Sequence, residues 1–350
     1  AFREMNIQTK GEFGGLGIEV TMENGIIKII SPIEGTPAYN ANIKTGDYII
    51  SINDEPVMGM TLNDAVEKMR GEAGSKIHLT IIRENTNEPI EIDIIREKIK
   101  FKTVRSNIFD KIAYIKINSF TESAADDSLI ELNKIKKSIG SDIQGLVLDL
   151  RNNPGGLLNQ AISVTDLFID DGEIVSTRGR SKDDTTRYNA TKGDEMDNLP
   201  IVVLINNGSA SASEIVAGAL QDQKRAIILG TKSFGKGSVQ TVIPMNEYGA
   251  LRLTTARYYT PSGRSIQAEG IIPDIIIENA KIEYAESVDP KKIYSEANLK
   301  KHLKNEEKNL IISKDNISSK IEVKTTRNMN DYQLARAIDL IKALNIFAKK

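Results

Sequence analysis

The first hundred residues alternate between short apolar runs and turn-forming residues. Five stretches have the composition and the period-two alternation of strands: 15–20, 25–33, 46–54, 76–85 and 90–96. A short helical segment, 36–43, interrupts them. A second, 61–71, opens with a threonine cap, carries apolar residues at helical spacing and stops at Gly71. The pattern predicts a small mixed α+β unit over residues 11–100, after a lead-in of residues 1–10.

From about residue 101 the pattern changes to alternating strands and helices. Strand-like runs at 111–120, 143–153, 198–207 and 224–230 are separated by helical stretches at 121–140 and 213–223. Such alternation predicts an α/β core over residues 101–280. The last part, 281–350, begins rich in lysine and glutamate, where the composition suits either a solvated helical arm or a flexible tether over 281–330. It ends in an amphipathic helix, 331–347, which packs on the core or on a partner.

Composition removes several classes of function. The chain has 350 residues, 40% of them hydrophobic, which is enough for two or three domains with real cores. A formal net charge of -2 leaves no basic surplus for nucleic acid. There is no cysteine, and the two histidines, His78 and His302, form no H-E-x-x-H pair, so we expect neither thiol catalysis nor a metal or other cofactor.

Membrane and export signals are equally sparse in the sequence. No run of about 18 apolar residues exists that could span a membrane. The opening AFREMNIQTK has neither an initial Met nor an apolar signal core, which is typical of a processed chain. Export of the protein stays open at this stage.

The stretch GTKSFGKGSVQ, residues 230–240, raises the question of what its lysine does. It nearly matches a phosphate-binding P-loop, but Gly237 stands where a serine or threonine is needed to ligate magnesium. Ser233 and Lys236 also match the S-x-x-K motif, which needs a helical turn that the glycines on both sides of the lysine disfavour. A solvated loop lysine is the simplest alternative.

A serine upstream offers this lysine a chemical role. Ser211 precedes Glu214 by three residues at the start of an apolar helical run, so it could be a helix cap worth about 1 kcal/mol and nothing more. A serine at that place also lies beside unsatisfied N–H groups, and the N–H of Ala212 could stabilise an oxyanion. Burial of Lys236 would favour the neutral amine that a general base needs. If a strand begins there, Gln240 lies on the same face and can hold the amine.

The glycine-rich segment of the N-terminal unit predicts a binding loop. Successive N–H groups around Gly14–Gly17 can form a nest for a terminal carboxylate, and the following strand, Ile18–Val20, can pair with an added peptide strand. The alternative is a glycine-rich hairpin turn. The long polar stretch 176–198 we expect to be a surface loop or lid without chemistry.

Residues 11–100 resemble a PDZ domain. The segment GEFGGLGIEV matches the carboxylate-binding loop of such domains, and SPIEGTPAYNANIKTGDYIISIND matches their central region. The resemblance implies that five residues bind the end of a peptide: Gly14, Gly15, Leu16, Gly17 and Ile18. Arg70 ends the helix that would flank this groove. We hypothesise that it couples groove filling to the core, although a cation at a helix C-terminus is favourable in any case.

Residues 206–240 closely resemble the serine–lysine core of the carboxyl-terminal processing, or tail-specific, proteases. The family spacing of 25 between serine and lysine selects Ser211 for Lys236, rather than Ser209 or Ser213. The family glutamine four residues beyond the lysine corresponds to Gln240. DLRNNPGG, residues 149–156, matches a further motif, in which Gly155 or Gly156 would complete the oxyanion hole, and residues 258–275 match another.

The resemblance implies a multidomain fold and a function. An N-terminal PDZ domain, an α/β protease core and a C-terminal helical segment would make a serine endopeptidase that captures unstructured, apolar C-terminal tails. It further implies a bacterial periplasm or cell envelope, a homo-oligomer with the helix 331–347 as a candidate contact, and an adaptor lipoprotein as a candidate partner. Two alternatives are a catalytically silent PDZ adaptor and an ATP-using enzyme.

Overall fold

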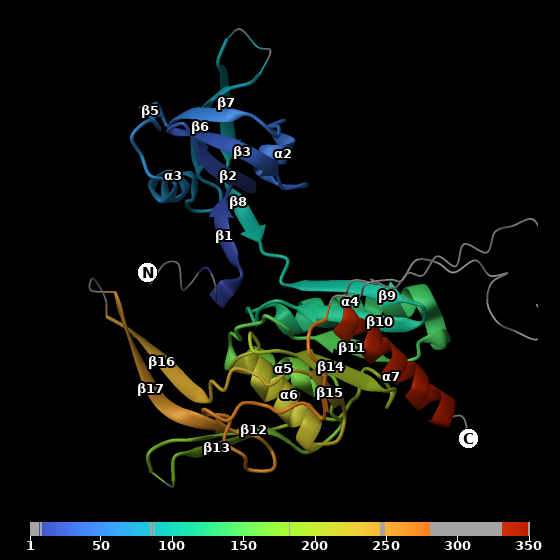
Figure 1. Cartoon of the computed structure of the whole chain (residues 1–350). Helices are drawn as coiled ribbons and strands as arrows, with labels where there is room; N and C mark the ends of the chain where they lie inside the picture. Colours follow the sequence, from blue (N-terminus) through green and yellow to red (C-terminus); the bar gives the residue numbers. More distant parts are fainter. Residues whose placement is uncertain are drawn as a thin grey trace, which may run out of the picture.

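The chain forms two folded units joined by a two-stranded ribbon (Figure 1). The computed structural model describes residues 7, 9–84, 86, 88–181, 183–245, 249–280 and 331–348. The charged linker expected over 281–330 and His302 lie outside the described residues, as do residues 1–6 of the lead-in. None of the helices in the described ranges is long and apolar enough to cross a membrane.

The N-terminal unit is built on an antiparallel sheet with strand order β2-β3-β4-β6-β7, and a short strand, β5, pairs with β4. The strands are β2 (Ile18–Glu23), β3 (Ile26–Pro32), β4 (Tyr48–Ile52), β5 (Glu55–Pro56), β6 (Lys76–Ile82) and β7 (Ile90–Ile95). Strand residues spaced by two bury one face, as in Ile27 and Ile29 of β3 or Ile77, Leu79 and Ile81 of β6. The five sequence-predicted strands are therefore confirmed, and β2 lies at a free edge of the sheet.

Two helices complete this unit, α2 (Pro37–Asn40) and α3 (Leu62–Met69). α3 begins with the threonine cap that the sequence predicts, because Thr61 and Asp64 form a reciprocal capping box. Its far end is held by Arg96, which is 6% exposed and donates to the carbonyl oxygens of Lys68 and Met69. α3 is thus fixed at both ends beside the edge strand β2.

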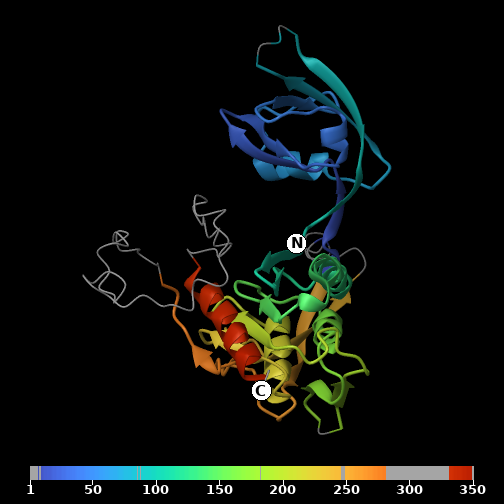
Figure 2. The same ribbon diagram turned by 90° about the vertical axis from the view of Figure 1, so that its right-hand side faces the viewer.

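The ribbon consists of β1 (Glu12–Gly15) and β8 (Glu97–Lys100), which pair antiparallel. The ring of Phe13 lies 5.4 Å from the ring of Phe101. Figures 1 and 2 both show the ribbon leading from the N-terminal unit to the core. The glycine-rich loop that precedes β2 is therefore continuous with β1, one of the two strands that connect the N-terminal unit to the core.

The core is a six-stranded sheet with order β18-β15-β14-β11-β10-β9, in which only β9 runs antiparallel to its neighbour. Its strands are β9 (Val104–Phe109), β10 (Ile112–Ile117), β11 (Leu146–Asp149), β14 (Ile201–Ile205), β15 (Ile227–Gly230) and β18 (Ile275–Ile276). Three helices and a 3-10 turn follow strands of this sheet or connect them: α4 (Ala124–Ile139), α5 (Leu158–Asp166), α6 (Ala212–Asp222) and η1 (Gly140–Asp142). This is the predicted α/β alternation.

The two faces of the core sheet bury different side chains of the same strands. In β11, Leu146 and Leu148 pack with helices α4, α5 and α6, whereas Val147 packs on the other face. There it meets Leu334 and Ile338 of α7 (Tyr332–Ala348). The predicted final helix is confirmed. Of the two partners that the sequence left open for its apolar residues, the core is the one observed, because Leu334, Ala337, Ile338 and Ile341 are buried on the chain's own sheet. Its candidate role as an oligomer contact stays a prediction.

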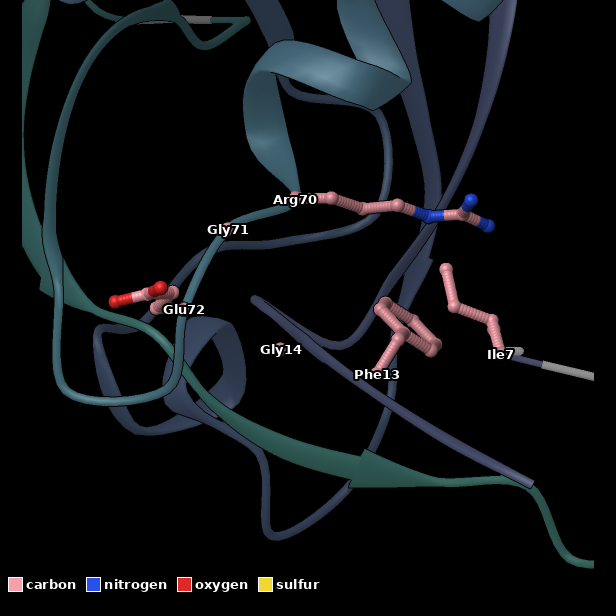
Figure 3. A pocket seen from close by; sticks show the side chains of 6 residues that line it. All are labelled: Ile7, Phe13, Gly14, Arg70, Gly71 and Glu72. Atoms are coloured by element: carbon pink, nitrogen blue, oxygen red, sulfur yellow. The ribbon is translucent and has the colours of Figure 1, made fainter. Parts of the chain in front are cut away.

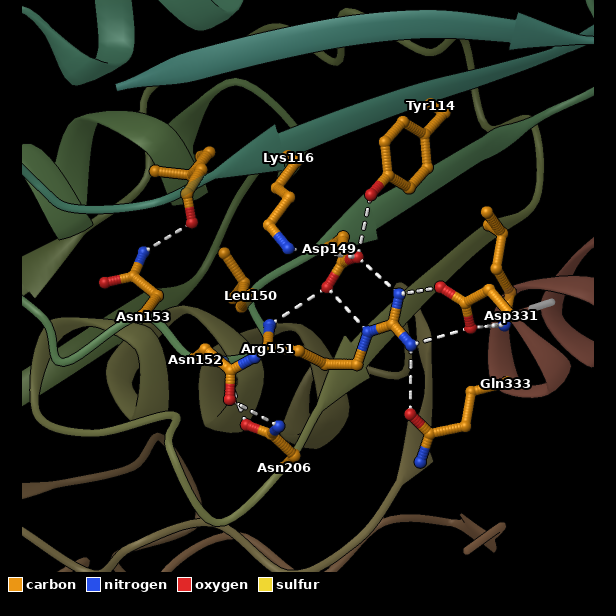
Figure 4. A network of polar contacts seen from close by, with 12 residues as sticks. Tyr114, Lys116, Asp149, Leu150, Arg151, Asn152, Asn153, Asn206, Asp331 and Gln333 are labelled. Carbon is orange, nitrogen blue, oxygen red and sulfur yellow. Dashed lines mark hydrogen bonds and ion pairs between the residues drawn. The ribbon is translucent and has the colours of Figure 1, made fainter. Parts of the chain in front are cut away.

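An ion-pair network holds the start of α7 to the carboxyl end of β11 (Figure 4). Arg151 donates to both oxygens of Asp149, at 2.9 and 2.6 Å, and to both oxygens of Asp331, at 2.9 and 2.7 Å. Asp149 is fully buried and also accepts from the hydroxyl of Tyr114 at 2.8 Å. Burial and this neighbouring carboxylate raise the pKa of Tyr114 above its usual range, so the hydroxyl keeps its proton.

A second, antiparallel sheet has the order β13-β12-β17-β16. Its strands are β12 (Glu173–Arg178), β13 (Thr185–Asn189), β16 (Ser238–Pro244) and β17 (Ala250–Tyr259). The polar stretch 176–198 is thus not only a loop, since it completes β12 and supplies β13. Its strand character escaped the sequence analysis because four of the five residues of β13 are exposed, which hides the apolar alternation.

Candidate active site

Ser211 stands immediately before α6 in a strained backbone conformation. Its φ of 54° and ψ of -112° are rare for any residue but glycine and cost about 1–3 kcal/mol. It is 8% exposed and forms the predicted capping box with Glu214. The N–H of Ala212, the first residue of the helix, has no hydrogen-bond acceptor among the described residues. A strained serine beside an unsatisfied donor is more than a helix cap requires.

The loop between β11 and α5 runs beside this serine. A Cβ atom on Gly155, whose φ is +103°, would lie 2.8 Å from the Cβ of Ser211 and 3.0 Å from the nitrogen of Ala212, so only glycine fits. The N–H of Gly155 donates to the side chain of Asn153 at 2.9 Å. The N–H of Gly156 has no acceptor in the part of the chain that the structure describes. Of the two candidate oxyanion glycines, Gly156 therefore keeps its donor available.

Asn153 fixes this loop against its neighbours. It is fully buried, and its side-chain amide donates to the carbonyl oxygen of Ile117 at 2.8 Å. Its backbone carbonyl oxygen accepts from the N–H of Ala210 at 3.0 Å and from the hydroxyl of Ser213 at 2.9 Å. These hydrogen bonds hold the glycine loop and the serine loop together.

Lys236 lies in the loop between β15 and β16 and is half-buried. β16 begins two residues later, at Ser238. Because side chains alternate along a strand, Ser238, Gln240 and Val242 point to one side, and all three line the same cavity as the lysine. The strand thus begins two residues after Lys236 and not at it, but Lys236 and Gln240 line one cavity.

One cavity of about 340 Å³ collects most of the predicted catalytic residues. Its lining includes Ser211, Lys236, Gln240, Gly155 and Gly156. Within the described chain no hydrogen bond joins the hydroxyl of Ser211 to the amine of Lys236, and none joins that amine to Gln240. Catalytic hydrogen bonds are often loose before substrate is bound.

Two further cavity-lining residues carry information that the sequence analysis did not use. Thr9, from the lead-in, lies in the cavity wall, and its carbonyl oxygen accepts from the N–H of Glu122 at 3.2 Å. Burial raises the pKa of Tyr258 to about 12, and the nearby Tyr188 adds to this effect. Its hydroxyl therefore stays protonated at neutral pH. Thr9 has no local signal in sequence, because it reaches the cavity only through the fold. Tyr258 opens the motif 258–275, but no role was expected of it.

Glu214 is fully buried and receives hydrogen bonds from two separate segments. Its Oε2 atom accepts from the N–H of Ser211 at 2.8 Å and from the N–H of Lys236 at 2.9 Å. Its Oε1 atom accepts from the hydroxyl of Ser233 at 2.5 Å and from the N–H of Gly235 at 2.6 Å. From the sequence only the capping box was predicted, because a capping motif is local and does not predict contacts with the loop that carries Lys236.

The same contacts exclude the nucleotide alternative for residues 230–237. A P-loop offers its N–H groups to phosphate and is followed by a helix, but here two of these N–H groups donate to Glu214 and a strand follows. A histidine as the general base of Ser211 is also excluded among the described residues, because His78 does not line the cavity. His78 lies in β6 of the N-terminal unit, where it is hydrogen-bonded to Asp93 at 2.9 Å. That contact raises the pKa of His78.

The predicted peptide-binding residues lie together beside the edge strand β2. Gly15, Leu16, Gly17 and Ile18 line a small cavity of about 100 Å³ whose opposite wall is formed by α3. The N–H groups of Leu16 and Gly17 have no acceptor in the described chain. Gly17 has φ +75°, and an added Cβ would collide with Thr36 at 2.3 Å. Gly14 lies outside this groove and lines a neighbouring pocket instead.

That neighbouring pocket, of about 370 Å³, lies where the ribbon meets the end of α3 (Figure 3). Arg70 lines both it and the groove, and Figure 3 shows its side chain reaching over the ring of Phe13. The guanidinium lies 5.0 Å from the centre of that ring and 3.4 Å from the carboxylate of Glu67. Glu67 lies in the N-terminal unit and Phe13 in the ribbon, so neither contact is with the core, and the coupling of Arg70 to the core stays a hypothesis.

Comparison with known families matches both units of the chain. The model of peptidase family S41 matches residues 111–277, and that of the PDZ domain matches residues 14–94. The first range contains all residues that line the cavity with Ser211 and Lys236 except Thr9, and the second contains all residues that line the groove between β2 and α3 except Phe13.

Relatives of considerable similarity share most of the chain's length. A carboxy-terminal-processing protease of Bartonella bacilliformis is 54% identical over 303 residues, which are 86% of this chain and 69% of that protein. A carboxyl-terminal-processing protease of Synechocystis is 33% identical over 305 residues, 85% of this chain and 70% of that protein. Among solved structures, the photosystem II D1 C-terminal processing protease has 28% identity and a TM-score of 0.46, covering 77% of this chain and 73% of its own.

Proposed function

Since the chain belongs to peptidase family S41 and is therefore a serine-type peptidase with a PDZ domain, we propose that Ser211 and Lys236 form its catalytic dyad. We propose further that the PDZ domain captures the C-terminal tail of a protein substrate. The observation that carries the dyad is the single cavity lined by Ser211, Lys236 and Gly156, with unsatisfied N–H groups on Gly156 and Ala212.

The reaction uses these groups in a fixed order. The hydroxyl of Ser211 attacks the scissile carbonyl while the amine of Lys236 takes its proton. The carbonyl oxygen becomes an oxyanion and receives hydrogen bonds from Ala212 and Gly156. Lys236 then gives the proton to the departing amine, and the acyl chain stays on Ser211 as an ester. Water then attacks that ester while Lys236 takes its proton. When the bond to the Ser211 oxygen breaks, Lys236 returns the proton to this oxygen, and the new C-terminus leaves as a carboxylic acid.

Gln240 is proposed to orient the lysine. It lies on the cavity side of β16, four residues beyond Lys236, and its amide oxygen can accept a hydrogen bond from the amine. Because β16 pairs with β17 along its whole length, the position of Gln240 is set by the sheet and not by a loop.

Substrate capture is proposed to occur at the groove of the N-terminal unit. An extended tail would add to the free edge of β2 and place its terminal carboxylate against the N–H groups of Leu16 and Gly17. The groove is lined by apolar side chains, among them Val20, Val66 and Met69, which suits an apolar tail. Gly14 would act indirectly, by shaping the ribbon beside the groove.

The setting of the protein is proposed from its bacterial relatives and the family resemblance. Periplasm or cell envelope, a homo-oligomer and an adaptor lipoprotein remain proposals of this kind. If α7 takes part in an oligomer, it does so through side chains other than its buried stripe. Ile346 and Phe347, 68% and 73% exposed, are the residues to examine.

Cleavage of a loosely folded reporter protein with an apolar C-terminal tail tests the proposal. We expect wild type to cut it, and Ser211→Ala and Lys236→Ala each to lower kcat by a factor on the order of 10⁴. Circular dichroism and tail binding should be those of wild type, because both side chains lie in the cavity and not in the groove. Binding of the tail without any cleavage by wild type would instead support a silent PDZ adaptor.

A further inference from the structure

One carboxylate oxygen contacts the backbone of both proposed catalytic residues. The Oε2 atom of Glu214 accepts from the N–H of Ser211 at 2.8 Å and from the N–H of Lys236 at 2.9 Å. These residues are 25 apart in sequence and belong to different loops. Because both backbone N–H groups donate to this one oxygen, the two nitrogens cannot be farther apart than the sum of the two hydrogen-bond lengths. Oε2 of Glu214 therefore limits the distance between the backbone of the nucleophile and the backbone of the base.

The second oxygen of Glu214 holds the lysine loop from the other side. Oε1 accepts from the hydroxyl of Ser233 at 2.5 Å and from the N–H of Gly235 at 2.6 Å. The Ser233 hydroxyl in turn accepts from the N–H of Ile271 at 2.7 Å. Ser233, the serine of the apparent S-x-x-K motif, thus connects the lysine loop to residues 258–275, the last motif that the sequence analysis singled out.

A helix cap alone would need only one of these contacts. In the capping box of α3, Asp64 serves its own cap residue, Thr61, and is exposed. Glu214 is fully buried and satisfies three donors from the lysine loop in addition to Ser211. A buried carboxylate is costly unless such donors surround it, which makes this arrangement specific to the acid.

We propose that Glu214, assisted by Ser233, is a positioning residue that sets the register between the nucleophile Ser211 and the base Lys236. This inference rests on the proposed dyad and deepens it. Glu214 does not touch the substrate. It holds Ser211 in its strained conformation through the N–H bond and fixes the turn from which the lysine side chain reaches into the cavity.

The substitution Glu214→Gln tests the role at nearly constant shape. An amide keeps one accepting oxygen but turns an NH₂ group toward two donors, so two of the four hydrogen bonds are lost. We expect kcat on a short untailed peptide to fall about 100-fold or more, with KM unchanged, because small misplacements of reacting groups have effects of that size. Labelling of Ser211 by a serine-reactive phosphonate should slow in parallel.

A second pair of variants keeps the test independent of how well Glu214→Gln folds. Ser233→Ala removes one donor to the carboxylate and the acceptor for Ile271, and we expect it to lower kcat and labelling. Ser233→Thr keeps the hydroxyl and should restore both.

Asp194→Asn is the matched stability control. Asp194 is also a largely buried carboxylate, accepting from the N–H groups of Met196 and Asn198 and from Arg225, and it does not line the cavity. We expect it to lower the unfolding temperature without changing kcat or labelling per folded molecule.

Wild-type kcat and labelling in both Glu214→Gln and Ser233→Ala would overturn the positioning role and leave the dyad intact. An equal loss of kcat in Asp194→Asn would overturn it too, since general loss of stability would then explain the effect. A wild type that neither cleaves nor labels would overturn the proposed function itself, and the positioning role with it.

Discussion

At the scale of single residues, the site depends on backbone positions that most side chains could not occupy. Ser211 adopts a conformation that costs about 1–3 kcal/mol and is held there by the N–H bond to Glu214. Gly155 passes so close to it that no Cβ fits. Backbone strain of this kind is common at active sites, where the chain must hold a reactive group in one orientation.

Replacing Gly155 by alanine should therefore reduce catalysis strongly. The new Cβ would meet the carbonyl oxygen of Ala210 at 2.7 Å and the Cβ of Ser211 at 2.8 Å, and it would displace the nucleophile. We expect kcat to fall about 100-fold, measured on a short peptide. Gly193→Ala is the control, because Gly193 also has positive φ, +141°, but has open space around it. A control as inactive as Gly155→Ala would contradict the steric explanation.

The sequence predicted which residues gather in the cavity better than it predicted their hydrogen bonds. Ser211, Lys236 and Gln240 were found through motif and spacing, and the structure places all three in one cavity. The preference for Gly156 over Gly155 in the proposed oxyanion hole came from the fold, which shows that the Gly155 N–H donates to Asn153. The long-range bonds of Glu214 had no local signal at all.

At the scale of elements, α7 is the piece whose partner the sequence left open. Its apolar stripe was clear, and the structure shows that it covers the face of the core sheet opposite α6. Arg151 connects its first turn to the end of β11 (Figure 4). The ion pairs of Arg151 therefore attach α7 to the start of the loop that carries Gly155 and Gly156, the proposed oxyanion residues.

Asp331→Asn should weaken this docking in a pH-dependent way. Burial raises the pKa of Asp331, but hydrogen bonds from Arg151 and from the N–H of Leu334 outweigh it and hold the pKa below its usual range. The stabilisation is therefore present above the unfolded pKa of about 3.9 and is lost as the pH falls through the lower folded pKa. We expect the substitution to cost about 1–3 kcal/mol in urea unfolding at pH 7. The difference from wild type should shrink toward pH 3, and a constant difference would contradict it.

Strands with one buried face were predicted reliably and exposed strands were not. The alternating β3 and β6 stand out in sequence, since every second residue is buried. β13 and much of β17 are exposed on both faces, so their residues carry no such pattern. β13 therefore falls within the stretch expected to be a loop, because pairing with β12, rather than burial, makes it a strand.

At the scale of the whole molecule, a single stretch of chain connects the groove to the cavity. Thr9 lines the cavity, β1 follows it as one strand of the ribbon, and Gly15 to Ile18 line the groove. Figures 1 and 2 show this ribbon as the link between the two units. Arg70 lies over Phe13 of the same stretch.

Arg70→Ala tests whether capture and cleavage are coupled. If Arg70 transmits groove filling to the core, the variant should cut a tailed reporter protein several-fold more slowly than wild type while cutting an untethered short peptide at the wild-type rate. Arg83→Ala, which removes an ion pair with Asp47 inside the N-terminal unit, is the control for loss of stability. Unchanged rates on both substrates would dispose of the coupling.

The central claim is that Ser211 becomes acylated with Lys236 as its base, and mapping a covalent label tests it most directly. Wild type, Ser211→Ala and Lys236→Ala would be treated with a peptidyl phosphonate, digested and analysed by mass spectrometry. We predict one modified residue in wild type, Ser211, no modification in Ser211→Ala, and labelling slowed by orders of magnitude in Lys236→Ala. A label on another serine, or wild-type labelling of Ser211 without Lys236, would contradict the account.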